Sequence, residues 1–218
     1  MTVAERLARI RAELAEELGA CGRSGDVRLL AVTKKQPVAA VAEAIAAGIA
    51  EIGENYLQEA AAKFALLPPV RTHFIGHLQT NKAKAVVAAF DVVQSVDRPE
   101  AAAALAKAAE ALGKRLDVLI QLNISPADRY GAPPAQAERL AEIVRGYAAL
   151  RLDGIMAIGP VSEDRAEISR AFALAAKTLD RVGGSTLSIG MSGDWREAVR
   201  AGSTMLRIGT ALFGPRTG

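Results

Sequence analysis

Short apolar runs alternate with alanine-rich segments along almost the whole chain. Eight runs have the length and composition of strands: Arg28–Thr33, Glu51–Glu54, Thr72–Gly76, Asp91–Ser95, Asp117–Ile124, Leu152–Ile158, Thr186–Gly190 and Met205–Gly209. Seven helical segments lie between them: Val38–Ala47, Leu57–Leu66, Thr80–Ala88, Pro99–Leu112, Pro134–Ala149, Glu163–Val182 and Asp194–Ala201. Alternation at this spacing predicts βαβ units and a parallel sheet.

A further helix is predicted before the first strand. Its apolar positions recur at helical spacing: Val3, Leu7, Ile10, Leu14 and Leu18. Charged residues interrupt this pattern, so we do not expect a signal peptide. Eight strand–helix repeats predict an α/β fold, a single (β/α)8 TIM barrel with an extra N-terminal helix; an open doubly wound sheet is the alternative. No linker or shift in composition divides the chain, so residues 1–218 are expected to form one domain.

Composition excludes several classes of protein. Half of the 218 residues are apolar and only 4% are aromatic, which favours closely packed alanine-rich helices. The net charge of +3 is spread along the chain without a basic block, so nucleic acid is not an expected partner. No apolar run is long enough to cross a bilayer. The single cysteine, Cys21, indicates a reduced cytoplasmic protein, and His73 and His77 lack the further ligands that a metal site needs.

Polar residues follow several of the predicted strands. In a parallel barrel, functional groups gather at the carboxyl ends of the strands. Lys34 and Lys35 follow the first strand, and if Leu30 and Val32 share a face with Lys34, then Lys35 points the other way. Such a lysine can simply extend into solvent. Alternatively, an amine at a barrel mouth can form a Schiff base with an aldehyde or ketone.

Two glycine-containing stretches, "GMSGDW" and "RIGTALFG", follow the seventh and eighth predicted strands. Backbone N–H groups and hydroxyls there can bind phosphate, which parallel barrels often hold at this corner. The alternative is that these glycines only form tight turns. Asp194 is expected to cap the next helix. Arg207 lies in an apolar strand, where it either pairs with Glu51 or Glu54 or donates to a ligand.

A lysine that binds an aldehyde and a corner that binds phosphate together indicate one ligand. Pyridoxal 5'-phosphate carries both an aldehyde and a phosphate on one ring. A Schiff-base aldolase that uses Lys34 on a phosphorylated sugar, with no cofactor, is the alternative from another class.

At these residues the sequence resembles the pyridoxal phosphate homeostasis proteins over essentially its whole length. The matching motifs are "LLAVTKKQP", "EIGENYLQEA", "THFIGHLQTNKAK", "LNIS", "LDGIMAI", "LSIGMSGDW" and "AGSTMLRIGTALFGPR". The resemblance implies a barrel like the N-terminal domain of alanine racemase. It further implies that Lys34 carries pyridoxal 5'-phosphate as a Schiff base (an internal aldimine). By motif position, Ser192, Gly209 and Thr210 are implied to bind the phosphate.

Three further contacts are implied by the resemblance. Arg207 is implied to face the pyridine nitrogen, Asn55 to lie near the phenolic side of the ring, and Met191 to pack against the cofactor. The chain departs from many relatives at Arg129, where lysine is common, and in the loop Gly159–Asp164. Both departures could alter the rim of the site and hence access or partners.

The resemblance implies a binding protein in vitamin B6 homeostasis that delivers its cofactor, with no catalytic residues assigned. An arginine beside the ring nitrogen disfavours a second positive charge there, which weakens the ring as an electron sink. In alanine racemase a further C-terminal domain supplies the opposite base, and none is expected after Gly218. A low-activity amino-acid racemase is the alternative, with Tyr56 or Tyr130 as the substitute base. We expect a monomer that makes transient contacts with apoenzymes that depend on this cofactor.

Overall fold

The computed structural model describes residues 1–125, 127 and 129–215. Its strands are β1 (Arg28–Val32), β2 (Glu51–Glu54), β3 (Arg71–Phe74), β4 (Val92–Val96), β5 (Leu116–Asn123), β6 (Leu150–Ile158), β7 (Thr186–Ser188) and β8 (Met205–Ile208). Its α-helices are α1 (Val3–Ala20), α2 (Val38–Ala46), α3 (Leu57–Phe64), α4 (Ala83–Ala89), α5 (Pro99–Ala111), α6 (Ala137–Arg145), α7 (Arg165–Val182), α8 (Trp195–Arg200) and α9 (Thr210–Phe213). Short 3₁₀ turns, Thr80–Lys82 and Pro134–Gln136, precede α4 and α6.

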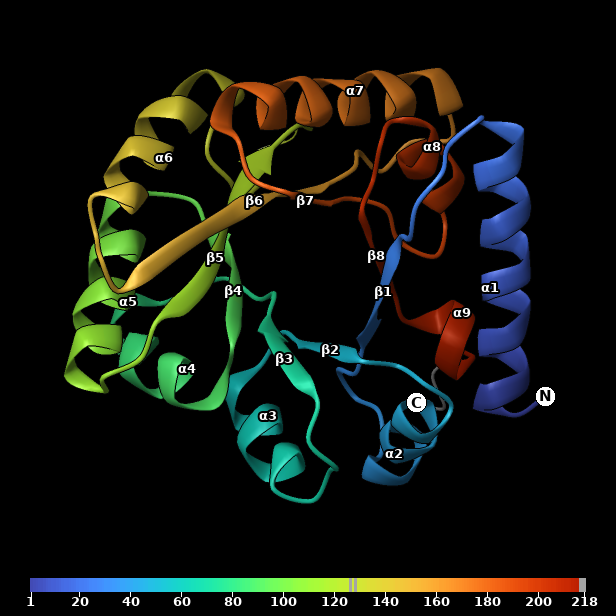
Figure 1. Ribbon diagram of the computed structural model, residues 1–218, viewed down its shortest axis with the longest axis horizontal. Coiled ribbons are helices and arrows are strands. Elements are labelled where there is room, and N and C mark those ends of the chain that lie inside the picture. Colours follow the sequence, from blue (N-terminus) through green and yellow to red (C-terminus); the bar gives the residue numbers. More distant parts are fainter. Residues whose placement is uncertain (126, 128, 216–218) are drawn as a thin grey trace.

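The strands form a closed parallel barrel in chain order, with the helices outside it (Figure 1). β1 closes the barrel against β8, and Leu30 lies opposite Arg207 in that pairing. The predicted TIM barrel is therefore confirmed, and the open doubly wound sheet is wrong. The strand bounds differ from the predicted ones by no more than two residues.

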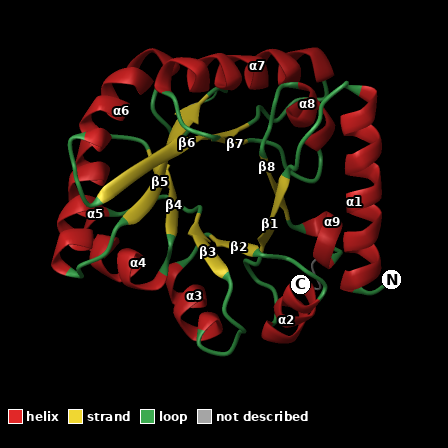
Figure 2. Cartoon of the chain, viewed as in Figure 1, coloured by secondary structure: helices red, strands yellow, loops and turns green. Residues whose placement is uncertain are grey.

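The outer ring of helices has one irregularity, visible in Figure 2. The sequence predicts no helix after the last strand, but α9 forms there as a single turn. The long helix α1 packs against α2, α8 and α9 and so covers the side of the barrel that this short turn leaves open. Thr2 and Glu5 form a reciprocal capping box that fixes the start of α1.

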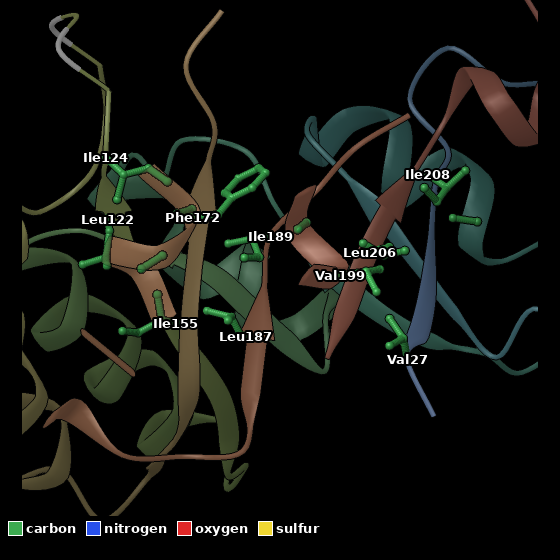
Figure 3. Packing of buried hydrophobic residues seen from close by; sticks show 14 of the residues in the cluster. Val27, Leu122, Ile124, Ile155, Phe172, Leu187, Ile189, Val199, Leu206 and Ile208 are labelled. Atoms are coloured by element: carbon green, nitrogen blue, oxygen red, sulfur yellow. The ribbon is translucent and has the colours of Figure 1, made fainter. Parts of the chain in front are cut away.

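Apolar side chains fill the layer between the sheet and the helices. Figure 3 shows part of this layer, in which Leu187 and Leu206 of the barrel belong to the same buried cluster as Phe172 of α7 and Val199 of α8. Glycines follow two of the helices: Gly48 and Gly113 have φ angles of 100° and 60°, a conformation that favours glycine at the end of a helix. Among the described residues, no helix is long and apolar enough to cross a membrane.

Candidate functional site

The end of the barrel where the strands terminate carries most of the polar residues that the sequence predicts for a site. Lys34 lies in a turn two residues beyond β1 and is half-buried, whereas the adjacent Lys35 is exposed. β8 is the hydrogen-bonded neighbour of β1. The loops that follow these two strands therefore leave the barrel side by side, and they bring Lys34 into the neighbourhood of Gly209.

Arg207 is buried inside the barrel, with 4% of its surface exposed. Its guanidinium donates from Nη1 to the carbonyl and hydroxyl oxygens of Ser188, at 2.5 and 2.9 Å, and from Nη2 to the carbonyl of Ala157, at 2.8 Å. The expected ion pair with Glu51 or Glu54 is wrong, because Glu51 contacts His73 and Glu54 contacts Lys63 instead. Strands β6 and β7 therefore hold Arg207 through neutral oxygens.

Burial lowers the pKa of Arg207 to about 10, while the nearby carboxylate of Asp194 acts in the opposite direction. The guanidinium therefore stays protonated at neutral pH. Burial also raises the pKa of Asp194 above its ordinary value. Asp194 precedes α8 as predicted, but its side chain does not cap that helix. Its Oδ1 instead accepts the backbone N–H of Met191 at 2.6 Å, which folds the loop back on itself.

The loop after β7 and the start of α9, which follows β8, meet in a corner formed by Ser192, Gly209, Thr210 and Ala211. The Ser192 hydroxyl accepts the N–H of Ala211 at 3.3 Å, so a side chain of the loop after β7 reaches the backbone of α9. Thr210 is exposed and Gly209 is half-buried. The predicted phosphate-binding residues are thus brought together in space.

The glycines near this corner differ in what they do. Gly190 has a φ of 91°, and a Cβ there would lie 2.5 Å from that of Ala198, so packing and conformation both require glycine. Gly209 has a φ of −113°, and a Cβ there would come no closer than 3.7 Å to its nearest neighbour, Val32. The tight-turn explanation therefore fits Gly190. At Gly209 the missing side chain leaves backbone open to a ligand.

Asn55 follows β2 and is half-buried, and its Oδ1 is fully buried without a hydrogen-bond partner among the described residues. A buried acceptor without a partner costs free energy, so this atom is suited to a ligand donor. The backbone at Gly76 passes close to that of Asn55. A Cβ at Gly76 would lie 2.1 Å from the carbonyl oxygen of Asn55. Met191 lies at the rim and is 37% exposed.

Cavities open next to several of these residues. One of 510 Å³ is lined by Gln121, Asn123, Arg129 and Tyr130, and one of 360 Å³ by Arg129, Met191, Asp194 and others. Arg129 donates to the carbonyl of Gly159 at 3.4 Å, so the two loops that depart from the relatives contact each other. A further cavity of 510 Å³ lies between α1 and β1 at the opposite end of the barrel, away from the predicted site residues.

A chain of polar side chains runs through the barrel interior below Arg207. Ser188 donates to Oε1 of Gln94 at 2.8 Å, and Nε2 of Gln94 lies 2.9 Å from Nδ1 of His73. Nε2 of His73 lies 2.8 Å from Glu51. We call Arg207, Ser188, Gln94, His73 and Glu51 the interior polar chain. His73 is therefore part of the packed interior of the barrel.

Part of this arrangement is not predicted by the sequence. Gln94 interrupts the apolar run "VVQSV", and this interruption was the available signal for a polar barrel interior. His77 lies at the rim, where its ring stacks on Tyr130 with 3.7 Å between ring centres. Among the described residues there is no cluster of three or more histidine, cysteine or acidic side chains suited to a metal ion.

Comparison with known proteins first defines the class of this barrel. The family model of the alanine racemase N-terminal domain matches residues 6–217. An alanine racemase from Clostridium difficile superposes with a TM-score of 0.75 at 14% identity, over 94% of this chain and 57% of that protein. That likeness shows the fold alone. The chain is thus a barrel of the alanine racemase N-terminal class.

Closer relatives define the family. The pyridoxal phosphate homeostasis protein of Pseudomonas aeruginosa is 45% identical over 99% of this chain and 96% of the relative, and that of Escherichia coli is 41% identical over 98% and 97%. The structure of PipY from Synechococcus elongatus with PLP bound superposes with a TM-score of 0.87 at 35% identity, covering 98% of this chain and all of PipY. The chain belongs to the family of pyridoxal phosphate homeostasis proteins.

Proposed function

We propose that this chain binds pyridoxal 5'-phosphate reversibly through Lys34 and acts in intracellular vitamin B6 homeostasis, delivering the cofactor to apoenzymes that depend on it. The observation that carries the proposal is the corner after β7 and β8, where the backbone of Gly209, which has room for a side chain but carries none, lies beside Ser192 and Thr210. The PLP-bound relative PipY and the names of the homeostasis relatives support it.

The residues present fit this ligand. Ser192, Gly209 and Thr210 would hold the phosphate through hydroxyl and backbone donors. The Lys34 amine would form a C=N bond with the aldehyde carbon, with loss of one water molecule. The unpartnered Oδ1 of Asn55 is an acceptor suited to a ligand hydroxyl on the phenolic side of the ring. Met191 would supply apolar contact at the rim.

Arg207 bears on the choice between a carrier and an enzyme, although alanine racemase tolerates the same arrangement. When bound, pyridoxal 5'-phosphate supplies an electron sink, and the sink is strongest with a protonated ring nitrogen. A guanidinium that stays protonated at neutral pH, facing that nitrogen, would disfavour such protonation. The fixed position of Arg207 in the barrel therefore favours binding over carbanion chemistry.

The two tyrosines considered as a second base also favour a carrier. Tyr56 and Tyr130 are 52% and 63% exposed. A general base acts efficiently when it is held at hydrogen-bond distance from the reacting proton. Both tyrosines are exposed, and Tyr130 stacks on His77 at the rim. Their exposure thus supports a protein that holds the cofactor and does not transform amino acids.

The attachment point can be tested with a matched pair of variants, Lys34→Arg and Lys35→Arg. Each removes one primary amine and keeps the positive charge. After incubation with pyridoxal 5'-phosphate and borohydride, we expect wild type and Lys35→Arg to carry one phosphopyridoxyl group by mass spectrometry and to show a visible absorbance band before reduction. Lys34→Arg should show neither. Equal labelling of both variants would contradict the proposal.

Delivery and catalysis are tested separately on the loaded protein. Mixed with an apoenzyme and a phosphatase that destroys free pyridoxal 5'-phosphate, a carrier should reactivate the apoenzyme, whereas the same amount of free cofactor should not. Loss of the α-proton of alanine in deuterated water, followed by NMR, measures racemase chemistry. Exchange that depends on Lys34 would favour the racemase over the carrier.

A further inference from the structure

Lys34 lies in a turn whose backbone conformation its own sequence does not favour. The turn comprises Thr33–Gln36 and is closed by the N–H of Gln36, which donates to the carbonyl of Thr33 at 3.0 Å. Lys35 is its third residue and has a φ of 59°, the one positive φ outside glycine among the described residues. Glycine or asparagine normally occupies such a position. Contacts from outside the turn must therefore hold it.

A buried pair of charged side chains makes two of these contacts. Lys63 of α3 donates to the carbonyl of Thr33 at 2.7 Å, and the Thr33 hydroxyl donates to Oε1 of Glu54 at 2.7 Å. Lys63 and Glu54 are themselves 2.5 Å apart. Both ends of this ion pair therefore bind the residue that immediately precedes Lys34.

A third contact fixes the other side of Lys34. Glu59, one turn before Lys63 in α3, accepts the backbone N–H of Lys35 at 2.8 Å. The same carboxylate oxygen lies 3.8 Å from Nζ of Lys63. The residues on both sides of Lys34 are thus bound by α3 and the end of β2.

The ion pair between Glu54 and Lys63 is buried, so its position needs an explanation other than net stability. The side chains of Glu54 and Lys63 are 0% and 7% exposed. Buried ion pairs contribute little net stability compared with apolar residues of similar size, because both charges lose their water. Stability alone therefore does not account for this pair, whereas its hydrogen bonds to the Lys34 turn give it a structural task.

We propose that Glu54, Lys63 and Glu59 are positioning residues that hold the Lys34 turn in the conformation needed for covalent attachment of the cofactor. The inference rests on the proposed function, because it concerns the amine that forms the C=N bond. It concerns attachment alone. The proposed phosphate corner lies beyond the ends of β7 and β8, and these three residues lie on β2 and α3.

Glu59 offers the sharpest test because its side chain is 32% exposed and its replacement leaves the buried pair intact. Glu59→Ala removes the acceptor for Lys35, whereas Glu59→Gln keeps an acceptor oxygen. Two ligands separate attachment from phosphate binding: pyridoxal 5'-phosphate, and pyridoxamine 5'-phosphate, which has no aldehyde. We expect Glu59→Ala to lower the affinity for pyridoxal 5'-phosphate by about tenfold and to leave the affinity for pyridoxamine 5'-phosphate unchanged. Glu59→Gln should bind both ligands like wild type.

A second substitution tests the role of the turn itself. Lys35→Gly permits the positive φ without strain. Added to Glu59→Ala, it should restore much of the lost affinity for pyridoxal 5'-phosphate. Glu138→Ala is the matched control, because it also removes a carboxylate from an exposed ion pair, with Arg181, but lies on α6. It should bind both ligands like wild type.

The outcomes separate this inference from the proposed function. If wild type forms no visible band with pyridoxal 5'-phosphate, the proposed function fails and the inference fails with it. If wild type forms the band and Glu59→Ala binds both ligands unchanged, the inference alone is overturned. If Glu59→Ala loses affinity equally for both ligands, the inference is also overturned, because an equal loss indicates a general loss of structure.

Discussion

Gln94 and His73 are hydrogen-bonded inside the barrel, with 2.9 Å between the amide Nε2 and the ring Nδ1. An amide nitrogen can only donate, so Nδ1 accepts and the ring proton is on Nε2, which faces Glu51 at 2.8 Å. The amide oxygen of Gln94 accepts from Ser188, which in turn accepts from Arg207. The hydrogen bonds of the interior polar chain therefore run in one direction, from Arg207 to His73, and the ring of His73 contacts Glu51 at its other side.

Gln94→Met tests the contribution of this chain to stability. Methionine has a similar volume but leaves the Nδ1 of His73 and the hydroxyl of Ser188 without their partner. Each unpaired buried group costs about 1–3 kcal/mol, so we expect the free energy of unfolding to fall by about 2–6 kcal/mol. Urea unfolding measures this. Gln58→Met, on the exposed surface of α3, is the control and should change it by no more than about 0.5 kcal/mol.

His73 predicts a pH dependence of stability. Burial lowers its pKa below 6.5, although hydrogen bonding to Glu51 acts in the opposite direction; the charges of Arg71 and Arg28 add to the lowering. The unfolded chain therefore takes up this proton at a higher pH than the folded one. The stabilising effect is present above about pH 6.5 and is lost as the pH falls through the pKa of the folded state, by about 1.4 kcal/mol for each pH unit between the two values.

The measurement compares His73→Gln with wild type in urea at several pH values between about 5 and 7.5. We expect the stability of wild type to decline toward acid more steeply than that of His73→Gln. His77→Gln, which removes the other histidine of the chain, is the matched control and should keep the wild-type slope. A wild-type slope in His73→Gln would show that another group is responsible.

Glu51 adds a second pH dependence. Hydrogen bonding and charge from His73 help to lower the pKa of Glu51 despite its burial, so the stability of the fold also declines toward acid below about pH 4.5.

Breaking the buried ion pair between Lys63 and Glu54 should cost more stability than breaking an exposed ion pair. Lys63→Met leaves the carboxylate of Glu54 buried without its cation, so we expect a loss of about 3–5 kcal/mol in the free energy of unfolding. Adding Glu54→Gln removes the uncompensated charge and should recover part of that loss. Arg181→Met breaks the exposed pair with Glu138 and should cost at most about 1 kcal/mol. If Lys63→Met has a free energy of unfolding no lower than that of Arg181→Met, this account is wrong.

The fold could be predicted because its signals are local. Strand and helix periodicity lies within each segment, and the polar residues after the strands, such as Lys34 and Ser192, need only the parallel arrangement to gather at one end. The partners of Glu54 and Gln94 could not be predicted in this way. Lys63 reads as a charge on an exposed helix face, and its burial depends on how α3 packs against β2 in three dimensions. The positive φ of Lys35 follows from those same contacts.

Gly209 and Gly190 give the clearest contrast between a glycine that we propose is needed for a ligand and one that the fold needs. A Cβ at Gly190 would lie 2.5 Å from that of Ala198, at a φ of 91°, so Gly190→Ala should lose about 2–4 kcal/mol in the free energy of unfolding. Gly209→Ala has room and should stay within about 1 kcal/mol of wild type. Its methyl group would instead occupy space next to the phosphate donors, so affinity for pyridoxal 5'-phosphate should fall by about tenfold. Affinity for pyridoxal, which has no phosphate, should change little. If Gly209→Ala binds pyridoxal 5'-phosphate like wild type, the phosphate lies elsewhere and the corner after β8 is only a turn.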